Sequence, residues 1–150
     1  MTTFESIADL KAAVGEHLGH SSWRTIDQAQ INAFADATGD HQWIHVDLER
    51  AAAGPFGTTI AHGYLVLSLL PELASEAYRV NGVRMGINYG LNRVRFPNPV
   101  PAGSVLRGGV KLLSVEDVEG GVQLVNEVTV ELRGATKPCC VAETVSRLYT

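Results

Sequence analysis

The chain has 150 residues, which suits one domain that buries about two-thirds of the surface of its unfolded form. Its formal net charge is -4 and 19% of its residues are charged, without a dense Lys/Arg face, which excludes nucleic acid as the main partner. The longest apolar run, residues 64–71, is too short to span a bilayer, and the first residues lack the pattern of a signal peptide. We therefore expect a cytoplasmic protein with no membrane segment.

The N-terminal part of the sequence predicts two helices with a short strand between them. Residues 4–18 carry apolar side chains at helical spacing, and this pattern ends at Gly19. Residues 22–26 fit a short strand that leads into a turn. Asp27 then fits the N-cap of a second helix, which Gly39 closes.

The next part contains a polar segment and then the most apolar helix of the chain. Residues 40–46 are expected to form a loop, and Asp47 to cap a short helix that runs through Ala53. Residues 61–80 are apolar almost all round, which is typical of a buried helix. Pro71 is expected to kink this helix or to divide it into two pieces.

The C-terminal half predicts an antiparallel sheet. Four Val-, Leu- and Thr-rich stretches are separated by Gly- and Pro-containing turns, at residues 84–96, 104–116, 121–133 and 138–149. Helices followed by strands indicate an α+β fold, here a sheet wrapped around the long apolar helix. Residues 1–150 are therefore expected to form one domain, with residues 1–21 as an N-terminal helical extension.

The two cysteines, Cys139 and Cys140, are adjacent in the last of these stretches. Neighbouring side chains of a strand point to opposite faces, so a disulfide between the two is not expected. We interpret both as reduced packing residues.

The segment from Gly39 to Asp47 carries the chemistry that suggests a function. Asp40 and His45 are five residues apart, and Gly63 begins the long helix soon after. A carboxylate and an imidazole can hold one water and move its protons near neutral pH, and amides at a helix start can polarise a carbonyl oxygen. Taken alone, Asp40 also fits a turn carboxylate and His45 a buried, hydrogen-bonded histidine.

Three stretches resemble one known family. Ala37-Thr38-Gly39-Asp40, Ile44-His45-Val46-Asp47 and Ile60-Ala61-His62-Gly63 together resemble the MaoC-like branch of the hot-dog-fold proteins, which includes the (R)-specific enoyl-CoA hydratases. The string from Gly39 to Asp47, with Met85–Gly90 and Val94–Pro97, is most similar to the nodulation-protein-N-like subgroup. The resemblance runs from about residue 22 to the C-terminus.

The resemblance implies a fold, a reaction and roles for three residues. It implies a single hot-dog protomer, a homodimer in which two sheets join edge to edge, and a tunnel for an acyl-CoA or acyl-carrier thioester near the subunit boundary. Asp40 and His45 would hold the water, and the Gly63 N–H would donate to the thioester oxygen. The reaction would be the reversible syn addition of water to a trans-2-enoyl thioester, with CoA as part of the substrate and no separate cofactor.

One departure from the family pattern concerns the residues between Asp40 and His45. Hydratases of this family usually have Asn-Pro there, whereas this chain has Gln42-Trp43. With His62, these two residues are the candidates for substrate contact, although His62 fits equally well a role in holding the loop. The spacing of acidic and histidine residues matches no zinc motif, so no metal site is expected.

Two other functions stay open from the sequence. A hot-dog thioesterase would need a carboxylate on the central helix aimed at the carbonyl, and Glu72 and Glu76 lie too far along that helix. A non-catalytic module that binds acyl-CoA or an acyl carrier is the second alternative, and the Gln42-Trp43 departure is the feature that favours it.

Overall fold

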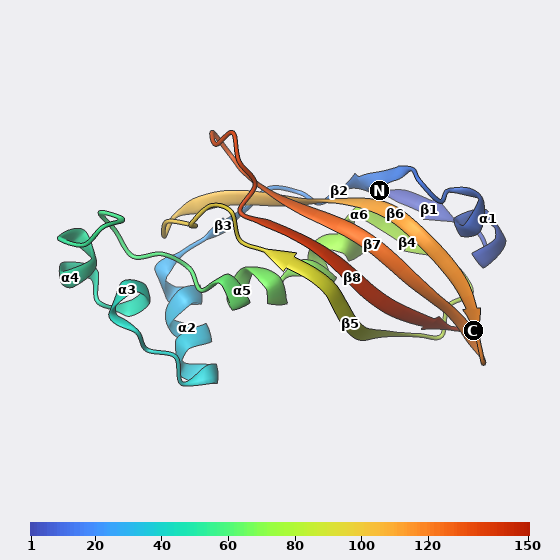
Figure 1. Cartoon of the computed structure of the whole chain (residues 1–150), viewed down its shortest axis with the longest axis horizontal. Helices are drawn as coiled ribbons and strands as arrows, with labels where there is room; N and C mark the ends of the chain where they lie inside the picture. Colours follow the sequence, from blue (N-terminus) through green and yellow to red (C-terminus); the bar gives the residue numbers. More distant parts are fainter.

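A computed structural model describes residues 1–150, and its main element is one antiparallel sheet that curves around two consecutive helices (Figure 1). The strand order is β2-β6-β7-β8-β5, and β3 also pairs with β6. The strands of this sheet are β2 (His17–His20), β3 (Arg24–Ile26), β5 (Met85–Arg95), β6 (Ser104–Val118), β7 (Gly121–Leu132) and β8 (Cys140–Tyr149). The four strands predicted in the C-terminal half and the α+β class are thus confirmed.

The apolar helix predicted over residues 61–80 consists of two pieces, α5 (Gly63–Ser68) and α6 (Leu70–Ala77). Leu69 separates them, and Pro71 lies in the first turn of α6, where a proline needs no intrahelical N–H partner. The predicted break is confirmed, but α6 ends before residue 80, because Tyr78–Val80 forms strand β4. The buried side chains of α6, Leu70, Leu73 and Ala77, pack against the concave face of the sheet.

The prediction of a helix over residues 4–18 is wrong in its extent. Only α1 (Ile7–Ala12) is helical; β1 (Thr2–Phe4) pairs in parallel with β4, and β2 joins the edge of the main sheet. The predicted helical extension over residues 1–21 therefore contains two strands. The helical spacing of apolar residues continues past the end of α1 because Leu10 on α1 and Leu18 on β2 are both buried in the core. Buried residues of two different elements therefore looked like one face of a single helix.

Helices α2 (Gln28–Thr38), α3 (Trp43–Val46) and α4 (Leu48–Ala52) extend from one end of the sheet (Figure 1). The caps of α2 are as predicted: Asp27 Oδ1 accepts from the Gln30 N–H at 2.9 Å, and Gly39 adopts the left-handed conformation with φ +82°. Asp47 caps α4, also as predicted. The predicted loop over residues 40–46 is wrong for its second half, where α3 forms one helical turn.

The hydrophobic core lies between α5–α6 and the concave face of the sheet. Alternate residues of β7 point into it from Val122 to Leu132. Cys139 and Cys140 are both buried and free, in agreement with the prediction that they form no mutual disulfide. Every helix falls short of the length and hydrophobicity that a membrane span requires.

Candidate active site

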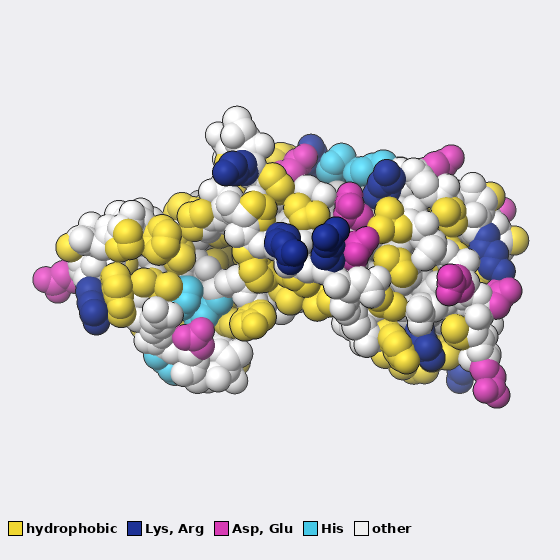
Figure 2. Space-filling view, viewed as in Figure 1, with side chains coloured by type: hydrophobic (Ala, Val, Ile, Leu, Met, Phe, Trp, Pro, Cys, Tyr) yellow, Lys and Arg dark blue, Asp and Glu magenta, His cyan; other side chains and the backbone are white.

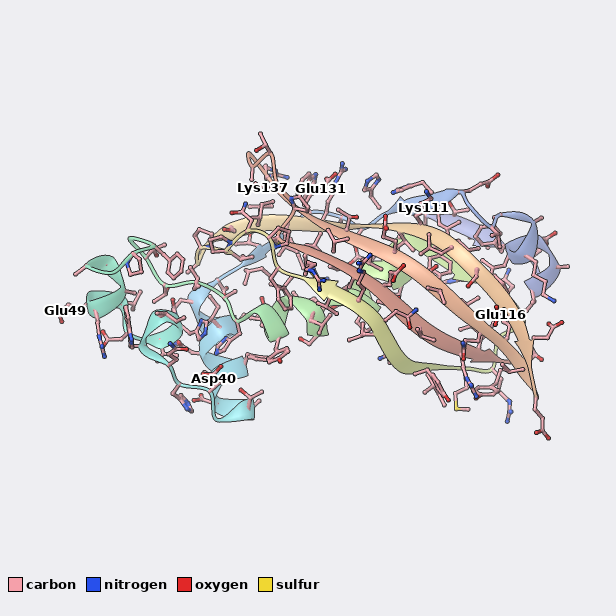
Figure 3. All side chains as sticks on the ribbon, viewed as in Figure 1. Asp40, Glu49, Lys111, Glu116, Glu131 and Lys137 are labelled. Carbon is pink, nitrogen blue, oxygen red and sulfur yellow. The ribbon has the colours of Figure 1, made fainter.

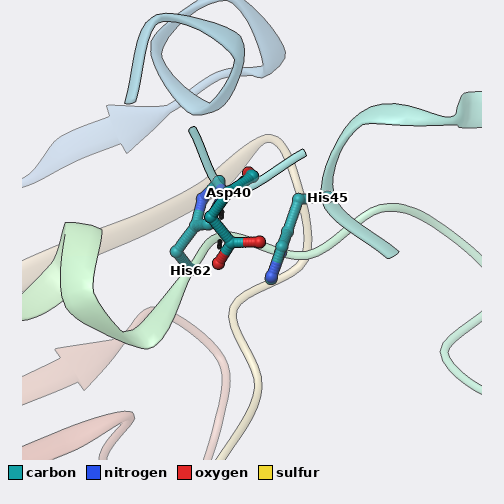
Figure 4. A group of neighbouring side chains, drawn as sticks. All are labelled: Asp40, His45 and His62. Carbon is teal, nitrogen blue, oxygen red and sulfur yellow. Dashed lines mark hydrogen bonds and ion pairs between the residues drawn. The ribbon is translucent and has the colours of Figure 1, made fainter. Parts of the chain in front are cut away.

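Asp40, His45 and His62 come together where the helical end of the molecule meets the sheet (Figure 4). Asp40 follows the end of α2, His45 lies in α3, and His62 immediately precedes α5. One nitrogen or carboxylate oxygen from each residue lies within 4.8 Å of those of the other two. Histidine side chains are visible at this junction in the space-filling view (Figure 2), and Asp40 is labelled there in Figure 3.

His45 is held in one orientation by the backbone. Its Nδ1 lies 2.7 Å from the carbonyl oxygen of Ile60, and the ring is buried, with 7% of its surface exposed. A carbonyl oxygen only accepts, so Nδ1 carries the proton that it donates. In the neutral ring, Nε2 is then the nitrogen with a free lone pair, which suits it to accept a proton from water.

Gln28, in the first turn of α2, supports the backbone of His45. Its Nε2 donates to the backbone carbonyl of His45 at 2.8 Å, and its Oε1 accepts from the hydroxyl of the fully buried Thr59. Gln28 and Thr59 could not be predicted as site residues from the sequence, because no pattern shows that a glutamine at a helix start will contact residues 17 and 31 positions further on.

His62 fastens the segment that carries Asp40. Its Nε2 donates to the backbone carbonyl of Asp40 at 2.9 Å, and its ring stacks on that of His45 with centroids 3.8 Å apart and an interplanar angle of 22°. Phe34 packs against the same ring, with a centroid distance of 4.9 Å. Of the two roles considered for His62, the hydrogen bond supports the one of holding the loop.

The Asp40 carboxylate is the accessible member of the group. Its side chain is 51% exposed, Oδ1 accepts from the Gln42 N–H at 3.3 Å, and Oδ2 lies 4.0 Å from His62 Nε2. The arrangement thus places a solvent-facing carboxylate beside a buried imidazole with one free nitrogen. Two groups at this separation can share one bridging water.

The same three residues are the only group with the composition of a metal site. A metal–nitrogen bond of about 2.0–2.1 Å lies in the plane of the imidazole ring. The rings of His45 and His62 are stacked in nearly parallel planes, so one ion cannot lie in both planes at bonding distance. The geometry therefore suits a water site better than a shared cation.

Gly63 is the first residue of α5, and His62 is its N-cap without a side-chain cap hydrogen bond. The first amides of a helix have no intrahelical partner, so the Gly63 N–H is free to donate at the edge of the site. A side chain at this position would meet the ring of Phe96, whose atoms lie 3.2 Å from the place of a Cβ. A larger side chain at this position would require the Phe96 ring to move by a few tenths of an ångström.

The side chains of Gln42 and Trp43 lie outside the group formed by Asp40, His45 and His62. Gln42 is exposed, and the bond to Asp40 comes from its backbone. Trp43 packs on Gly54, where a Cβ would lie 2.9 Å from its ring, and Arg50 stacks over it at 4.4 Å. The indole thus joins α3 to α4, and the proposed contact of these two side chains with substrate stays a prediction.

Glu72 and Glu76, the carboxylates of the central helix, are engaged elsewhere. Arg24 contacts Glu72 at 2.9 Å and Glu76 at 3.1 Å, and Ser22 also binds Glu76. Their bonds to Arg24 and Ser22 hold the pKa of both carboxyls below the usual value. Neither belongs to the group around His45, which argues against a role in thioester hydrolysis.

Comparison with known proteins agrees with this picture. A family model described as MaoC like domain matches residues 9–133. The 3-hydroxyacyl-thioester dehydratase Z of Mycobacterium tuberculosis is 62% identical over 98% of both chains. Nodulation protein N of Rhizobium leguminosarum bv. viciae is 48% identical over 94% of this chain and 89% of its own.

The solved structures show the fold. The unliganded R-hydratase of Pseudomonas aeruginosa has a TM-score of 0.70 at 24% identity, over 91% of this chain and 81% of its own. The (R)-hydratase of A. caviae has a TM-score of 0.71 at 23% identity, and the match covers 90% of this chain and 96% of the hydratase chain. The sheet wrapped around α5–α6 is the hot-dog fold, and the chain belongs to the MaoC-like dehydratase family.

Proposed function

We propose that this protein is a hydro-lyase that interconverts a trans-2-enoyl thioester and the (R)-3-hydroxyacyl thioester. The observation that carries the proposal is the Asp40 carboxylate beside the free nitrogen of His45, at a separation that one water can bridge. The 62% identity to a protein named as a 3-hydroxyacyl-thioester dehydratase supports the same reaction.

In the hydration direction, Asp40 and His45 hold one water between them and take a proton from it as its oxygen bonds to C3. The C2–C3 double bond becomes a single bond, and negative charge develops on the thioester oxygen. The Gly63 N–H donates to that oxygen, a contribution worth a factor of about 10²–10³ in rate. A proton returns from the same pair to C2, so hydrogen and hydroxyl add to one face.

The proposed reaction balances without a separate cofactor. Water supplies the hydroxyl group at C3 and the proton at C2, and no electrons are exchanged. CoA or an acyl-carrier prosthetic group is the handle of the substrate, and both handles are compatible with the site. We also propose a cytoplasmic location, because cysteines stay reduced there and both cysteines of this chain are free.

We propose that the acyl chain of the substrate enters a cavity of about 420 Å³. It lies between α6 and strands β5, β7 and β8, and Leu70 is the lining residue nearest to Gly63 in the sequence. Leu70 is seven residues beyond Gly63, which is about 10 Å along a helix. A chain whose thioester binds at Gly63 would have to extend about this far along α5 to enter the cavity.

A homodimer is part of the proposal. Strand β5 ends the sheet and leaves its outer edge unpaired, and it carries exposed large apolar side chains at Met85, Ile87, Tyr89 and Leu91. A long, apolar, unprotected edge is a template for pairing with another strand. Edge-to-edge pairing of two β5 strands would cover these side chains.

The proposed function is tested by adding crotonyl-CoA to the purified protein while recording both the enoyl-thioester absorbance and free CoA. Loss of absorbance without CoA release is the expected result. Release of CoA would instead identify a thioesterase. Binding without either change, repeated with longer enoyl chains, would identify a binding module.

A further inference from the structure

The cavity proposed for the acyl chain has one aromatic side chain in its wall, that of Tyr78. Leu70, Ala74 and Tyr78 all line this cavity, and they follow one another at intervals of four residues. Residues four apart lie on the same face of a helix, so the three form one row along α6 that ends at Tyr78, its C-cap residue. Tyr78 lies eight residues beyond Leu70, which is about 12 Å along a helix. The aromatic ring therefore belongs to the part of this row that is farthest from Gly63.

The Tyr78 side chain crosses from the helix layer to the sheet. Its hydroxyl oxygen accepts from Nδ2 of Asn126 at 3.0 Å. Asn126 is buried and lies on β7, the central strand of the sheet. Because a buried amide N–H without a partner is costly, this hydrogen bond holds the ring across the space between α6 and β7.

The N-terminal strand β1 supports the same ring. β1 pairs in parallel with β4, toward the end of the sheet away from α2–α4 (Figure 1), and Thr2 lies opposite Tyr78. The Phe4 ring meets the Tyr78 ring edge-on, with a centroid distance of 6.5 Å. Tyr78 and Val80 of β4 line the cavity, whereas β1 contributes no lining residue. Phe4 therefore packs against the Tyr78 ring from outside the cavity.

We infer that Tyr78, held by Asn126 and Phe4, sets the upper limit on the length of the acyl chain that the cavity accepts. A chain that runs from Gly63 along α5 and α6 gains free energy from burial until it meets the ring. A longer chain has to displace a side chain that is fixed by two neighbours, which costs free energy as overpacking does. The N-terminal segment thus takes part in substrate selection, although it lies outside the cavity. This inference rests on the proposed function for the path of the acyl chain.

The test measures kcat/KM for trans-2-enoyl-CoA substrates of increasing length, from crotonyl-CoA to trans-2-hexadecenoyl-CoA. For the wild-type protein we expect kcat/KM to fall steeply beyond one length. Tyr78→Val removes the ring and suits a strand, so it should raise kcat/KM for the first substrate beyond that length by about tenfold or more, the worth of one methylene group in an apolar pocket. Arg79→Val is the matched control, because Arg79 is the exposed neighbour on β4 and does not line the cavity. It should keep the wild-type length limit.

An unchanged length limit in Tyr78→Val, or a wild-type protein without such a limit, would overturn the inference. If Tyr78→Val does not fold, Phe4→Ala takes its place, since it removes the support from outside the cavity; it should move the limit toward longer chains, and an unmoved limit overturns the inference. If the wild-type protein leaves every substrate unchanged, the proposed function fails by itself. The same compounds are then compared by calorimetric binding, where a shift of the folded variant toward longer chains supports the inference and an unchanged profile overturns it.

Discussion

The carbonyl of Ile60 determines which nitrogen of His45 is free to accept a proton. Because Nδ1 donates to this carbonyl at 2.7 Å, Nε2 is the nitrogen that stays without a hydrogen bond, and in the proposed mechanism it binds the water. His62 adds no free group of comparable exposure; it holds Asp40 through the backbone and supports the His45 ring by stacking. The motif predicted the pair of Asp40 and His45, but the supporting bonds of Gln28 and His62 depend on the tertiary fold.

Gln28 is expected to matter for both stability and turnover. Gln28→Leu leaves the Thr59 hydroxyl and the His45 carbonyl without their partner, which should lower the free energy of unfolding by about 1–3 kcal/mol. It should also lower kcat, because His45 loses a support. Urea unfolding and crotonyl-CoA kinetics measure the two effects. Gln30→Leu, in the same turn, is the control, and equal stability of the two variants would contradict the role of Gln28.

The two cysteines are expected to be inert in the folded protein. Burial raises the pKa of Cys139 to about 12 and that of Cys140 to about 11. At about pH 8 both groups are therefore protonated thiols, which are poor nucleophiles. A chromogenic disulfide reagent should label neither thiol in native protein and both in guanidinium chloride. Rapid labelling of native protein would show that the strand start at Cys140 opens.

At the scale of the elements, local signals sufficed where the end of a helix is determined by its own residues. Asp27 and Gly39 marked both ends of α2, and Asp47 marked the start of α4. The N-terminal segment could not be predicted in the same way, because β2 exists through its pairing with β6.

The end of α2 offers a test of how a local conformation positions Asp40. Gly39 has a φ of +82°, and no atom lies within 4 Å of the place of a Cβ, so Gly39→Ala should act through backbone strain alone. The left-handed conformation costs an alanine about 1–2 kcal/mol. Gly39→Asn should cost less, because asparagine tolerates this conformation. Urea unfolding compares the three proteins, and an alanine variant as stable as the asparagine variant would argue against strain at this residue.

For the molecule as a whole, the free edge of the sheet is connected to the candidate site through strand β5. The helical end supplies Asp40, His45 and His62, whereas β5 supplies both an unpaired edge and part of the cavity wall. Dimerisation through β5 would therefore close the cavity of each protomer. The sheet and its order of strands follow from the hot-dog fold, but the sequence alone did not indicate which side chains would lie exposed on that edge.

A charge on the edge should separate the proposed dimer. Leu91 is 46% exposed on β5, and Leu91→Lys would place an ammonium group in the paired interface. Light scattering after size exclusion should give a dimer mass for the wild-type protein and a monomer mass for this variant. Leu48→Lys, at a leucine that is 62% exposed on α4, is the control and should remain dimeric. A monomeric wild-type protein, or a dimeric Leu91→Lys variant, would contradict pairing through β5.

In the proposed mechanism, Asp40 and His45 together move the protons of one water. The most direct measurement is the rate of crotonyl-CoA hydration by the wild-type protein and by Asp40→Asn, with Asp36→Asn as the control. Asp36 is an exposed carboxylate near the same helix end and pairs with His41 at 2.9 Å, outside the group around His45. We expect Asp40→Asn to keep the fold and to lose about 10²–10⁴-fold in kcat/KM, while Asp36→Asn stays near the wild-type rate. Wild-type turnover in Asp40→Asn would contradict this mechanism.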